Sequence, residues 1–174
     1  SAIAIRMHKS YAVHGVIGVD GRAYINGWDN YGASRVPELY PGESFVDLQI
    51  ASHVVAKTSY GRWLQWGTTN GPGGTVRTTP LPALPSGIAF ERIVTVGNGG
   101  LALLSDGSLF TWRASPTSSF LICPPVPPGV QVVAMDGVAY GGIHTAAVVL
   151  SNGSLLVWGD PSSFGLTNVP TLPP

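Results

Sequence analysis

Apolar stretches and short polar turns alternate along this chain, and the alternation returns every 40 to 46 residues. The string SDGSLFTWR runs from Ser105 to Arg113 and SNGSLLVWG from Ser151 to Gly159, so their turn glycines are 46 positions apart. An apolar stretch rich in Val, Ile and Leu precedes each string, and each string ends close to a tryptophan. Short apolar runs bounded by turn residues predict buried β-strands.

The unit occurs four times. In three copies the turn glycine lies five positions before a tryptophan, at Gly61 and Trp66, Gly107 and Trp112, and Gly153 and Trp158. The first copy is weaker, because Trp28 falls two positions late after Gly21. We expect the two-residue turns to be of type I′, which suits Asn-Gly and Asp-Gly. They are Asp20-Gly21, Tyr60-Gly61, Asp106-Gly107 and Asn152-Gly153.

Several strands per unit at this period are typical of a β-propeller, in which each blade buries its faces against its neighbours. The sequence therefore predicts an all-β chain of about four blades, each with three to four short antiparallel strands, and no substantial helix. We assign residues 1–174 to one propeller domain, with repeats near 1–43, 44–88, 89–128 and 129–174. Four units either close on themselves or are completed by partner chains, and the second arrangement is favoured because an open arc exposes apolar faces and strand edges.

The loops between the units are candidate contact surfaces. GASRVP begins at Gly32 and GLTNVP at Gly165, whereas residues 67–87 and 114–129 are longer Gly-, Thr- and Pro-rich stretches. Such loops are either simple spacers or binding elements on a rigid frame. Tyr and Arg are enriched at interface hot spots, and Phe164 alternatively fills a blade. The candidate contact residues are Tyr31, Arg35, Tyr40, Arg77, Arg113, Phe120 and Phe164.

The fourth unit resembles the repeat of the regulator-of-chromosome-condensation family. That repeat has a Gly-rich step into His-Thr, a turn, a strand ending in Trp-Gly, and then a Gly and Val-Pro. The matching positions are Gly141, Gly142, His144, Thr145, Asn152, Gly153, Trp158, Gly159, Gly165, Val169 and Pro170. The resemblance is strong in the fourth unit, fair in the second and third, and loose in the first. It is closest in style to short bacterial versions, including the propeller that inhibits β-lactamases.

This resemblance implies a propeller and a structural role for the repeated positions. The repeat signature comprises Gly21, Gly61, Trp66, Gly107, Trp112, His144, Gly153, Trp158 and Gly165. In that family the His fixes a strand-to-strand step, a role we expect for His144 and consider for His53. Family members usually carry more blades on one chain than the four units found here. Obvious counterparts of the loops by which the eukaryotic nuclear member acts on its GTPase are lacking, so its exchange activity is not carried over.

Composition narrows the class of partner. Charged residues make up 10% of the 174 positions, and nine basic residues balance nine acidic ones. A nucleic-acid-binding protein should show a clustered basic surplus, so DNA or RNA binding is not expected. No apolar run reaches the roughly 18 residues of a membrane helix, so we expect no membrane insertion. The low charge points to close association with other protein chains, either copies of itself or assembly partners.

Catalytic and metal-binding motifs are missing from the pattern. His8 and His14 have no Cys or Glu nearby, and Cys123 is the one cysteine, in an apolar context. GTTNGPGG has no following Lys-Ser/Thr, and there is no nucleophile elbow. Asp29, Asp136 and Asp160 lie in or beside loops without a spacing that demands an acid/base pair. We expect no enzyme activity, no metal and no cofactor.

Two function classes remain. The first is a structural or host-recognition component of a virus particle, most plausibly a tailed phage, and it follows from low charge, Gly/Pro/Thr-rich loops and the need for partners. The second is a free protein-binding propeller, such as a secreted inhibitor or a scaffold module. No signal peptide is recognisable at the start, so we expect cytoplasmic synthesis and a final place in a virion or outside the cell. The opening Ser also fits a processed, exported chain.

Overall fold

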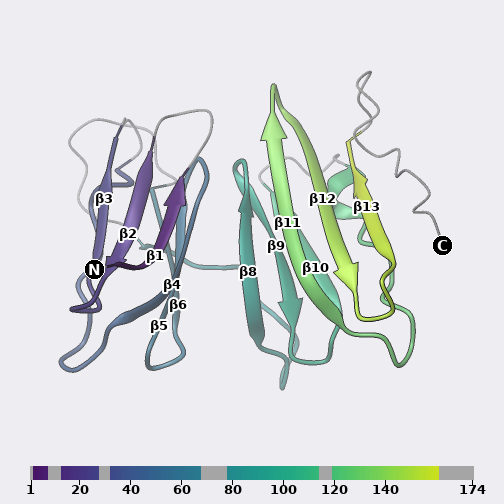
Figure 1. Ribbon diagram of the computed structural model, residues 1–174, viewed down its shortest axis with the longest axis horizontal. Helices are drawn as coiled ribbons and strands as arrows, with labels where there is room; N and C mark the ends of the chain where they lie inside the picture. The colour runs from purple at the N-terminus through teal and green to yellow at the C-terminus, as the bar shows by residue number, and fades with distance from the viewer. Residues whose placement is uncertain (1, 8–12, 28–31, 68–77, 114–118, 161–174) are drawn as a thin grey trace. The chain divides into compact units, whose positions relative to one another are not determined.

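The computed structural model describes residues 2–7, 13–27, 32–67, 78–113 and 119–160, and their regular secondary structure is almost entirely β-strand (Figure 1). Their one helical element is a single 3-10 turn, η1 (Ser119–Leu121). The expected all-β fold is therefore confirmed. The chain divides into two compact units, residues 1–83 and 84–174, which we call unit 1 and unit 2.

Each unit contains two small antiparallel sheets, whose strands are consecutive in the chain. The sheets are numbered in chain order, and each falls within one of the four expected repeats. Sheet 1 contains β1 (Ala2–Met7), β2 (His14–Gly18) and β3 (Ala23–Asn26), and sheet 2 contains β4 (Phe45–Ile50), β5 (Val54–Thr58), β6 (Trp63–Trp66) and β7 (Thr78–Thr79). Sheet 3 contains β8 (Phe90–Val96), β9 (Gly99–Leu104) and β10 (Leu109–Arg113), and sheet 4 contains β11 (Val132–Tyr140), β12 (Ile143–Leu150) and β13 (Leu155–Gly159). The division into two units leaves the single-propeller organisation of residues 1–174 a prediction.

The glycine turns recur in all four sheets, but they are not of the expected type I′. In sheet 3 the Gly107 amide donates to the Leu104 carbonyl and the Leu104 amide donates to the Ser108 carbonyl, at 2.9 Å each. This pattern is a three-residue hairpin loop, a type I turn closed by a bulged glycine. Gly107 has a φ of 81°, and its three counterparts lie between 73° and 83°. The glycine is therefore required after the turn, where the chain is left-handed, and not within a two-residue turn.

A serine just before three of these glycines ties each hairpin to the loop that enters its sheet. The Ser105 amide donates to the Ala89 carbonyl at 2.9 Å, and the Ala89 amide donates to Ser105 Oγ at 3.0 Å. Ser59 and Ser151 make the same pair of bonds with residues 44 and 131. The three serines are 46 positions apart, like the glycines, and the serine repeat was missed in the sequence.

The entering loops end in a shared turn. Tyr40-Pro41-Gly42-Glu43 closes with a bond from the Glu43 amide to the Tyr40 carbonyl at 3.0 Å, and Gly42 has a φ of 77°. A positive φ at the third residue of the turn, directly after a proline at the second, is the mark of a type II turn. The same bond and a positive-φ glycine precede β8 and β11, at Gly87 and Gly129. The three glycines each lie three positions before a first strand, so chain entry into sheets 2, 3 and 4 is set locally.

The core of each unit lies between its two sheets. In unit 1, Ile17 and Ala23 of sheet 1 pack with Leu48, Val54 and Trp66 of sheet 2, all at most 8% exposed. In unit 2, the partners from sheet 3 are Val96, Leu101 and Leu103, and those from sheet 4 are Ala146, Val148 and Trp158. Residues two apart on one strand point to the same face, so the apolar alternation of the sequence supplies these layers.

Candidate functional site

Two tryptophans each bind, through a hydrogen bond, the loop that precedes their own sheet. Trp158, at the end of β13, donates its indole N–H to the Phe120 carbonyl at 3.1 Å. Trp66, at the end of β6, donates in the same way to the Ala33 carbonyl at 2.9 Å. Their side chains are 8% and 1% exposed, so each bond satisfies a buried donor. We call each of these two bonds a tryptophan clamp.

Trp112 departs from this pattern. It is only half-buried, and its ring packs on its own sheet, 6.0 Å from the Phe110 ring and 6.1 Å from the Phe90 ring between centroids. Its cross-strand partner is Gly100, and a Cβ added there would lie 2.3 Å from the Trp112 ring. The missing side chain at Gly100 therefore lets the indole lie across the sheet.

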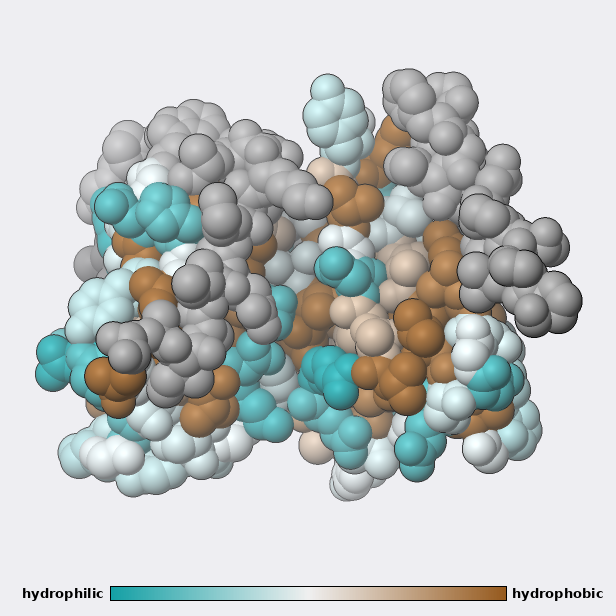
Figure 2. Space-filling view, viewed as in Figure 1, coloured by the Kyte–Doolittle hydropathy of each residue, from teal (hydrophilic) through white to brown (hydrophobic). Residues whose placement is uncertain are grey.

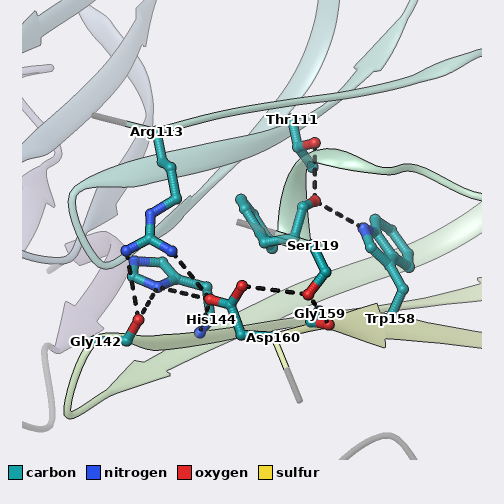
Figure 3. A network of polar contacts seen from close by, with 9 residues as sticks. Thr111, Arg113, Ser119, Gly142, His144, Trp158, Gly159 and Asp160 are labelled. Carbon is teal, nitrogen blue, oxygen red and sulfur yellow. Dashed lines mark hydrogen bonds and ion pairs between the residues drawn. The ribbon is translucent and has the colours of Figure 1, made fainter. Parts of the chain in front are cut away.

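Beside the Trp158 clamp lies a charged network that joins the ends of sheets 3 and 4 (Figure 3). Arg113, the last residue of β10, donates to Asp160 Oδ2 at 3.0 Å, and the two side chains are 12% and 16% exposed. The same carboxylate oxygen accepts the His144 backbone amide at 3.0 Å, and the Asp160 amide donates to the His144 carbonyl at 2.8 Å. Arg113 also donates to the Gly142 carbonyl at 3.4 Å. Because both charges are mostly withdrawn from water, each needs the other.

His144 lies behind this ion pair with 3% exposure. Its Nδ1 is 3.1 Å from the Gly142 carbonyl oxygen, which only accepts, so Nδ1 carries the proton. Its Nε2 has no hydrogen-bond partner among the described residues, and a Cβ at Gly97 would lie 2.5 Å from it. Burial lowers the pKa of His144, and the nearby Arg113 charge lowers it further. The imidazole is therefore neutral and fixed in place.

The network contains Ser, His and Asp side chains but does not form a nucleophile–base pair. Ser119 Oγ donates to the Gly159 carbonyl at 2.7 Å and lies 3.3 Å from Asp160 Oδ1. Nucleophilic catalysis needs the base nitrogen within hydrogen-bond reach of the hydroxyl. Here the unprotonated His144 Nε2 points at Gly97, so the arrangement holds loop and sheets together.

Phe120 was expected to contact a partner, and the structure corrects this. The side chain is 0% exposed and lies in the core of unit 2, with its ring 5.7 Å from that of His144. Its carbonyl accepts both the Trp158 indole and Thr111 Oγ1. An apolar ring on this short 3-10 turn fills the space between the sheets, and it is unavailable to another protein.

The strongest exposed cluster lies in unit 1, where Tyr40 and Tyr60 are 60% and 59% exposed. The guanidinium carbon of Arg62 stands 4.0 Å from the Tyr40 ring centroid, and Arg62 also pairs with both carboxylate oxygens of Glu43. Tyr60 donates its hydroxyl to the Pro41 carbonyl at 3.0 Å. The Arg62 guanidinium lowers the pKa of Glu43 to about 2, so the pair is charged at neutral pH. We call Tyr40, Glu43, Tyr60 and Arg62 the tyrosine cluster.

The other sequence candidates are scattered or lie elsewhere. Arg35 is half-buried, and its amide donates to the Gly32 carbonyl at 3.2 Å. Two of the contact candidates, Arg113 and Phe120, lie in or beside the charged network of unit 2. Tyr40 and Arg35 lie in unit 1. His53 is 2% exposed but stands one position beyond the counterpart of His144, counted from the turn glycine. Tyr31, Arg77, Phe164 and Gly165 lie outside the described residues.

Arg62 and Glu43 were missed in the sequence, and Asp160 was noted there only as a carboxylate in or beside a loop. A signal existed for the Arg113–Asp160 pair, because Arg113 occupies the position that is Gly27, Gly67 and Gly159 in the other three repeats.

Cys123 is partly buried, burial raises the pKa of its thiol, and Thr111 Oγ1 lies 3.3 Å from Sγ. Within the described ranges no three His, Cys, Asp or Glu side chains are grouped as metal ligands. Nor does any helix there have the length and apolar character to cross a membrane.

Several solved structures share this fold. Human WBSCR16 matches with a TM-score of 0.63 and 16% identity over 91% of this chain and 48% of its own. Yeast RCC1 (Prp20), solved bound to Kap60, matches with a TM-score of 0.63 and 16% identity over 91% of this chain and 43% of its own. The CRINKLY WD40 ectodomain of the Arabidopsis thaliana receptor kinase ACR4 matches with a TM-score of 0.58 and 19% identity over 95% of this chain and 54% of its own. The resemblance to RCC1-like propellers is thus confirmed at the level of fold.

This chain spans about half the length of the solved chains that it matches. No protein-family model matches it, and no curated protein matches it in sequence.

Proposed function

We propose that this chain is part of a non-enzymatic propeller that binds other proteins through exposed loop surfaces. Its fold is shared with proteins that bind protein partners: yeast Prp20 was solved bound to Kap60, and its binding to Gsp1p and histones was also examined. The observation that carries the proposal for this chain is the tyrosine cluster of unit 1, because it joins exposed aromatic rings to a rigid framework.

The tyrosine cluster is held in place before any partner arrives. Arg62 is fixed by its ion pair with Glu43, and Tyr60 is fixed by its bond to Pro41, so neither side chain needs much further ordering. Binding normally costs about 0.5–1.5 kcal/mol for each side chain that becomes immobilised. Tyr and Arg side chains that are already ordered are therefore well suited to serve as an interface hot spot.

The test is affinity capture with a matched pair of variants. Immobilised chain and the Tyr40→Ala/Tyr60→Ala variant are incubated with the same extract, and captured proteins are measured by quantitative mass spectrometry. Tyr24→Ala is the control, because Tyr24 is also an exposed tyrosine, at 53%, but lies on β3 outside the cluster. We expect at least one protein to be lost with the double variant and retained with the control. Identical captured sets would remove the cluster as the binding surface.

The narrower hypotheses are a tailed-phage virion component and, as the alternative, a secreted inhibitor or scaffold module. The first is supported by the 10% content of charged residues and the Gly- and Pro-rich loops. The second is supported by the resemblance to short bacterial propellers. Light scattering across a range of concentrations separates them: a defined oligomer favours the structural component, and a single-chain mass throughout favours the free module.

A further inference from the structure

A loop of unit 2 is built mostly from prolines. Residues 122–128, Ile-Cys-Pro-Pro-Val-Pro-Pro, lead from η1 into the turn before β11, and we call them the proline segment. Every residue from 123 to 127 is a proline, directly precedes one, or both. Proline fixes φ at about −65°, and the residue before a proline is moved to extended or polyproline II backbone. The described peptide bonds are all trans, as this helix requires. These constraints hold the segment in polyproline II geometry.

The burial of the proline segment follows the period of such a helix. Polyproline II has three residues per turn, so residues three apart lie on one ridge. Cys123 and Val126 are half-buried and pack against the core of unit 2. On the next ridge Ile122, Pro125 and Pro128 are all exposed, and Ile122 reaches 73%. The segment therefore lies on the core along one ridge and turns the other two outward.

All four prolines stand on the two outward ridges. Pro125 and Pro128 share the ridge just described, and the other outward ridge carries Pro124, half-buried, and Pro127, exposed. The Pro-x-x-Pro spacing thus occurs twice, once on each outward ridge. Protein grooves that bind polyproline II helices are lined by aromatic side chains and recognise this spacing. The proline segment presents to solvent the side that such a groove contacts.

The inward ridge is shared with the equivalent loop before sheet 2. Counted back from the glycines of the entry turns, Val36 and Leu39 stand where Cys123 and Val126 stand. They are partly buried as well, and they pack against the core of unit 1. Seating this loop on a core therefore depends on an apolar pair on the inward ridge.

The outward ridges differ from loop to loop. In the proline segment the four outward positions are all proline. The same four positions are Pro37, Glu38, Tyr40 and Pro41 before sheet 2, and Pro82, Ala83, Pro85 and Ser86 before sheet 3. The loop thus forms with a charged, an aromatic or a small residue in place of a proline. Seating alone does not account for the full set of four prolines, and recognition by a partner does.

The surroundings of the proline segment are poor in charge. No charged residue occurs between Arg113 and Asp136 in the chain. Figure 2 shows apolar side chains gathered over β12 and β13 of the same unit. Aromatic rings packing on prolines need no counter-charge, so this composition suits an aromatic groove better than a charged one.

The proline segment is also ordered before any partner arrives. The Ile122 amide donates to the Ser119 carbonyl at 3.1 Å, and the Val130 amide donates to the Pro127 carbonyl at 3.1 Å. Thr111 Oγ1 lies 3.3 Å from Cys123 Sγ between these two points. A segment that is already fixed loses little conformational entropy on docking, which favours binding through a small contact area.

We propose that the proline segment docks into an aromatic-lined groove of a partner protein, of the class found in SH3, WW and EVH1 domains. The prolines of the two outward ridges pack on the tyrosine and tryptophan rings of the groove, while the inward ridge stays on unit 2. The proposal goes beyond the tyrosine cluster, because it assigns a different surface and names the class of its partner.

The test titrates the full chain into three isolated probe domains, an SH3, a WW and an EVH1 domain, each carrying a fluorescent label. Fluorescence polarisation should show saturable binding to at least one probe. Pro124→Ala/Pro127→Ala should weaken this binding by at least about tenfold. The matched control is Pro82→Ala/Pro85→Ala, at the equivalent positions before sheet 3 and with the same burial, and it should leave the binding unchanged.

A peptide keeps the test decisive if a variant of the chain does not fold, which circular dichroism reveals. A synthetic peptide of residues 121–129, with Cys123→Ser to prevent oxidation, should displace the full chain from the probe. The same peptide with Pro124→Ala/Pro127→Ala should not displace it.

Binding to none of the three probes overturns the proposal. Binding that Pro124→Ala/Pro127→Ala leaves intact, or that both double variants weaken equally, would place the contact elsewhere on the chain and also overturn it. Neither outcome bears on the tyrosine cluster, whose failure would appear only in the capture experiment.

Discussion

In unit 2 the Trp158 clamp is joined by Arg113, Asp160 and His144, whereas no ion pair is found beside the Trp66 clamp among the described residues of unit 1. Unit 1 has a charged pair too, but its Arg62 directly precedes β6, whereas Trp66 ends that strand. The side chains of Arg62 and Glu43 are 33% and 0% exposed. The charges of unit 2 lie at the junction of its two sheets, whereas those of unit 1 lie beside the exposed ring of Tyr40.

This contrast predicts different responses to the loss of each group. Trp66→Ala and Trp158→Ala should each lower the free energy of unfolding by about 3–5 kcal/mol, since each removes a buried aromatic side chain. Trp112→Ala should cost clearly less, because Trp112 is half-buried and clamps no described loop. Chemical denaturation followed by circular dichroism measures all three, and equal losses would contradict the distinction between clamp and surface tryptophans.

Breaking the buried ion pair should have the next largest effect. Asp160→Asn leaves Arg113 mostly buried without its counter-charge, which should lower the free energy of unfolding by about 1–3 kcal/mol. Arg113→Gly restores the residue type of the other three units, so the double variant should lose less than the sum of the two single losses. Strict additivity in this double-mutant cycle would show that the two side chains act independently.

The turn glycine of sheet 1 differs from those of the other three sheets, with a smaller expected effect. Gly107→Ala forces an L-residue into the left-handed region, which should cost about 1–2 kcal/mol, and no atom lies within 4 Å of the new Cβ. Gly21→Ala adds a clash, because the Cβ would lie 2.3 Å from Ser44 Cβ. Thermal unfolding should show a larger loss at Gly21, and equal losses would mean that Ser44 moves aside freely.

A pH titration distinguishes the buried histidine of unit 2. The pKa of His144 is below its ordinary value of 6.5 in the folded chain, so the unfolded state binds the proton more readily. Stability is then complete above pH 6.5 and falls as the pH drops below it, with a slope of at most about 1.4 kcal/mol per pH unit. His144→Asn, which copies Asn98 at the corresponding position of sheet 3, should remove this dependence. A slope unchanged by the substitution would exclude His144 as its source.

The smallest effect is expected at the tyrosine cluster. The pKa of Glu43 falls from 4.5 unfolded to about 2 folded, so its stabilisation is present above pH 4.5 and is lost as the pH falls toward 2. The Arg62 side chain is 33% exposed and the Glu43 side chain 0%, so water and salt reach the pair from the Arg62 side. Because one of the two charges keeps this contact with water, Glu43→Gln should lower the thermal midpoint less than Asp160→Asn at neutral pH. High salt should shrink the Glu43→Gln effect further, and a salt-independent loss would indicate a more buried pair.

Much of the fold could be predicted because its signals are local. The spacing of Gly61, Gly107 and Gly153 located three hairpins, and their apolar flanks located the strands on either side. The prediction of the turn type was wrong because Asp-Gly suits both a two-residue type I′ loop and a three-residue loop with a bulged glycine. Only the hydrogen-bond pattern distinguishes the two. Ser59, Ser105 and Ser151 carried a readable signal at the same spacing, but their role depends on a loop that lies about 15 to 20 residues earlier in the chain.

The sequence alone determined that the chain is built from four repeated β-units, because alternation and turn glycines act between near neighbours. Tertiary structure alone decided which copies of a repeated residue do the same work. Trp158 is clamped while Trp112 lies across Gly100, and Phe120 is buried while Tyr40 is exposed. Burial, pairing and pKa depend on residues dozens of positions away, and packing brings these together only once the sheets have formed.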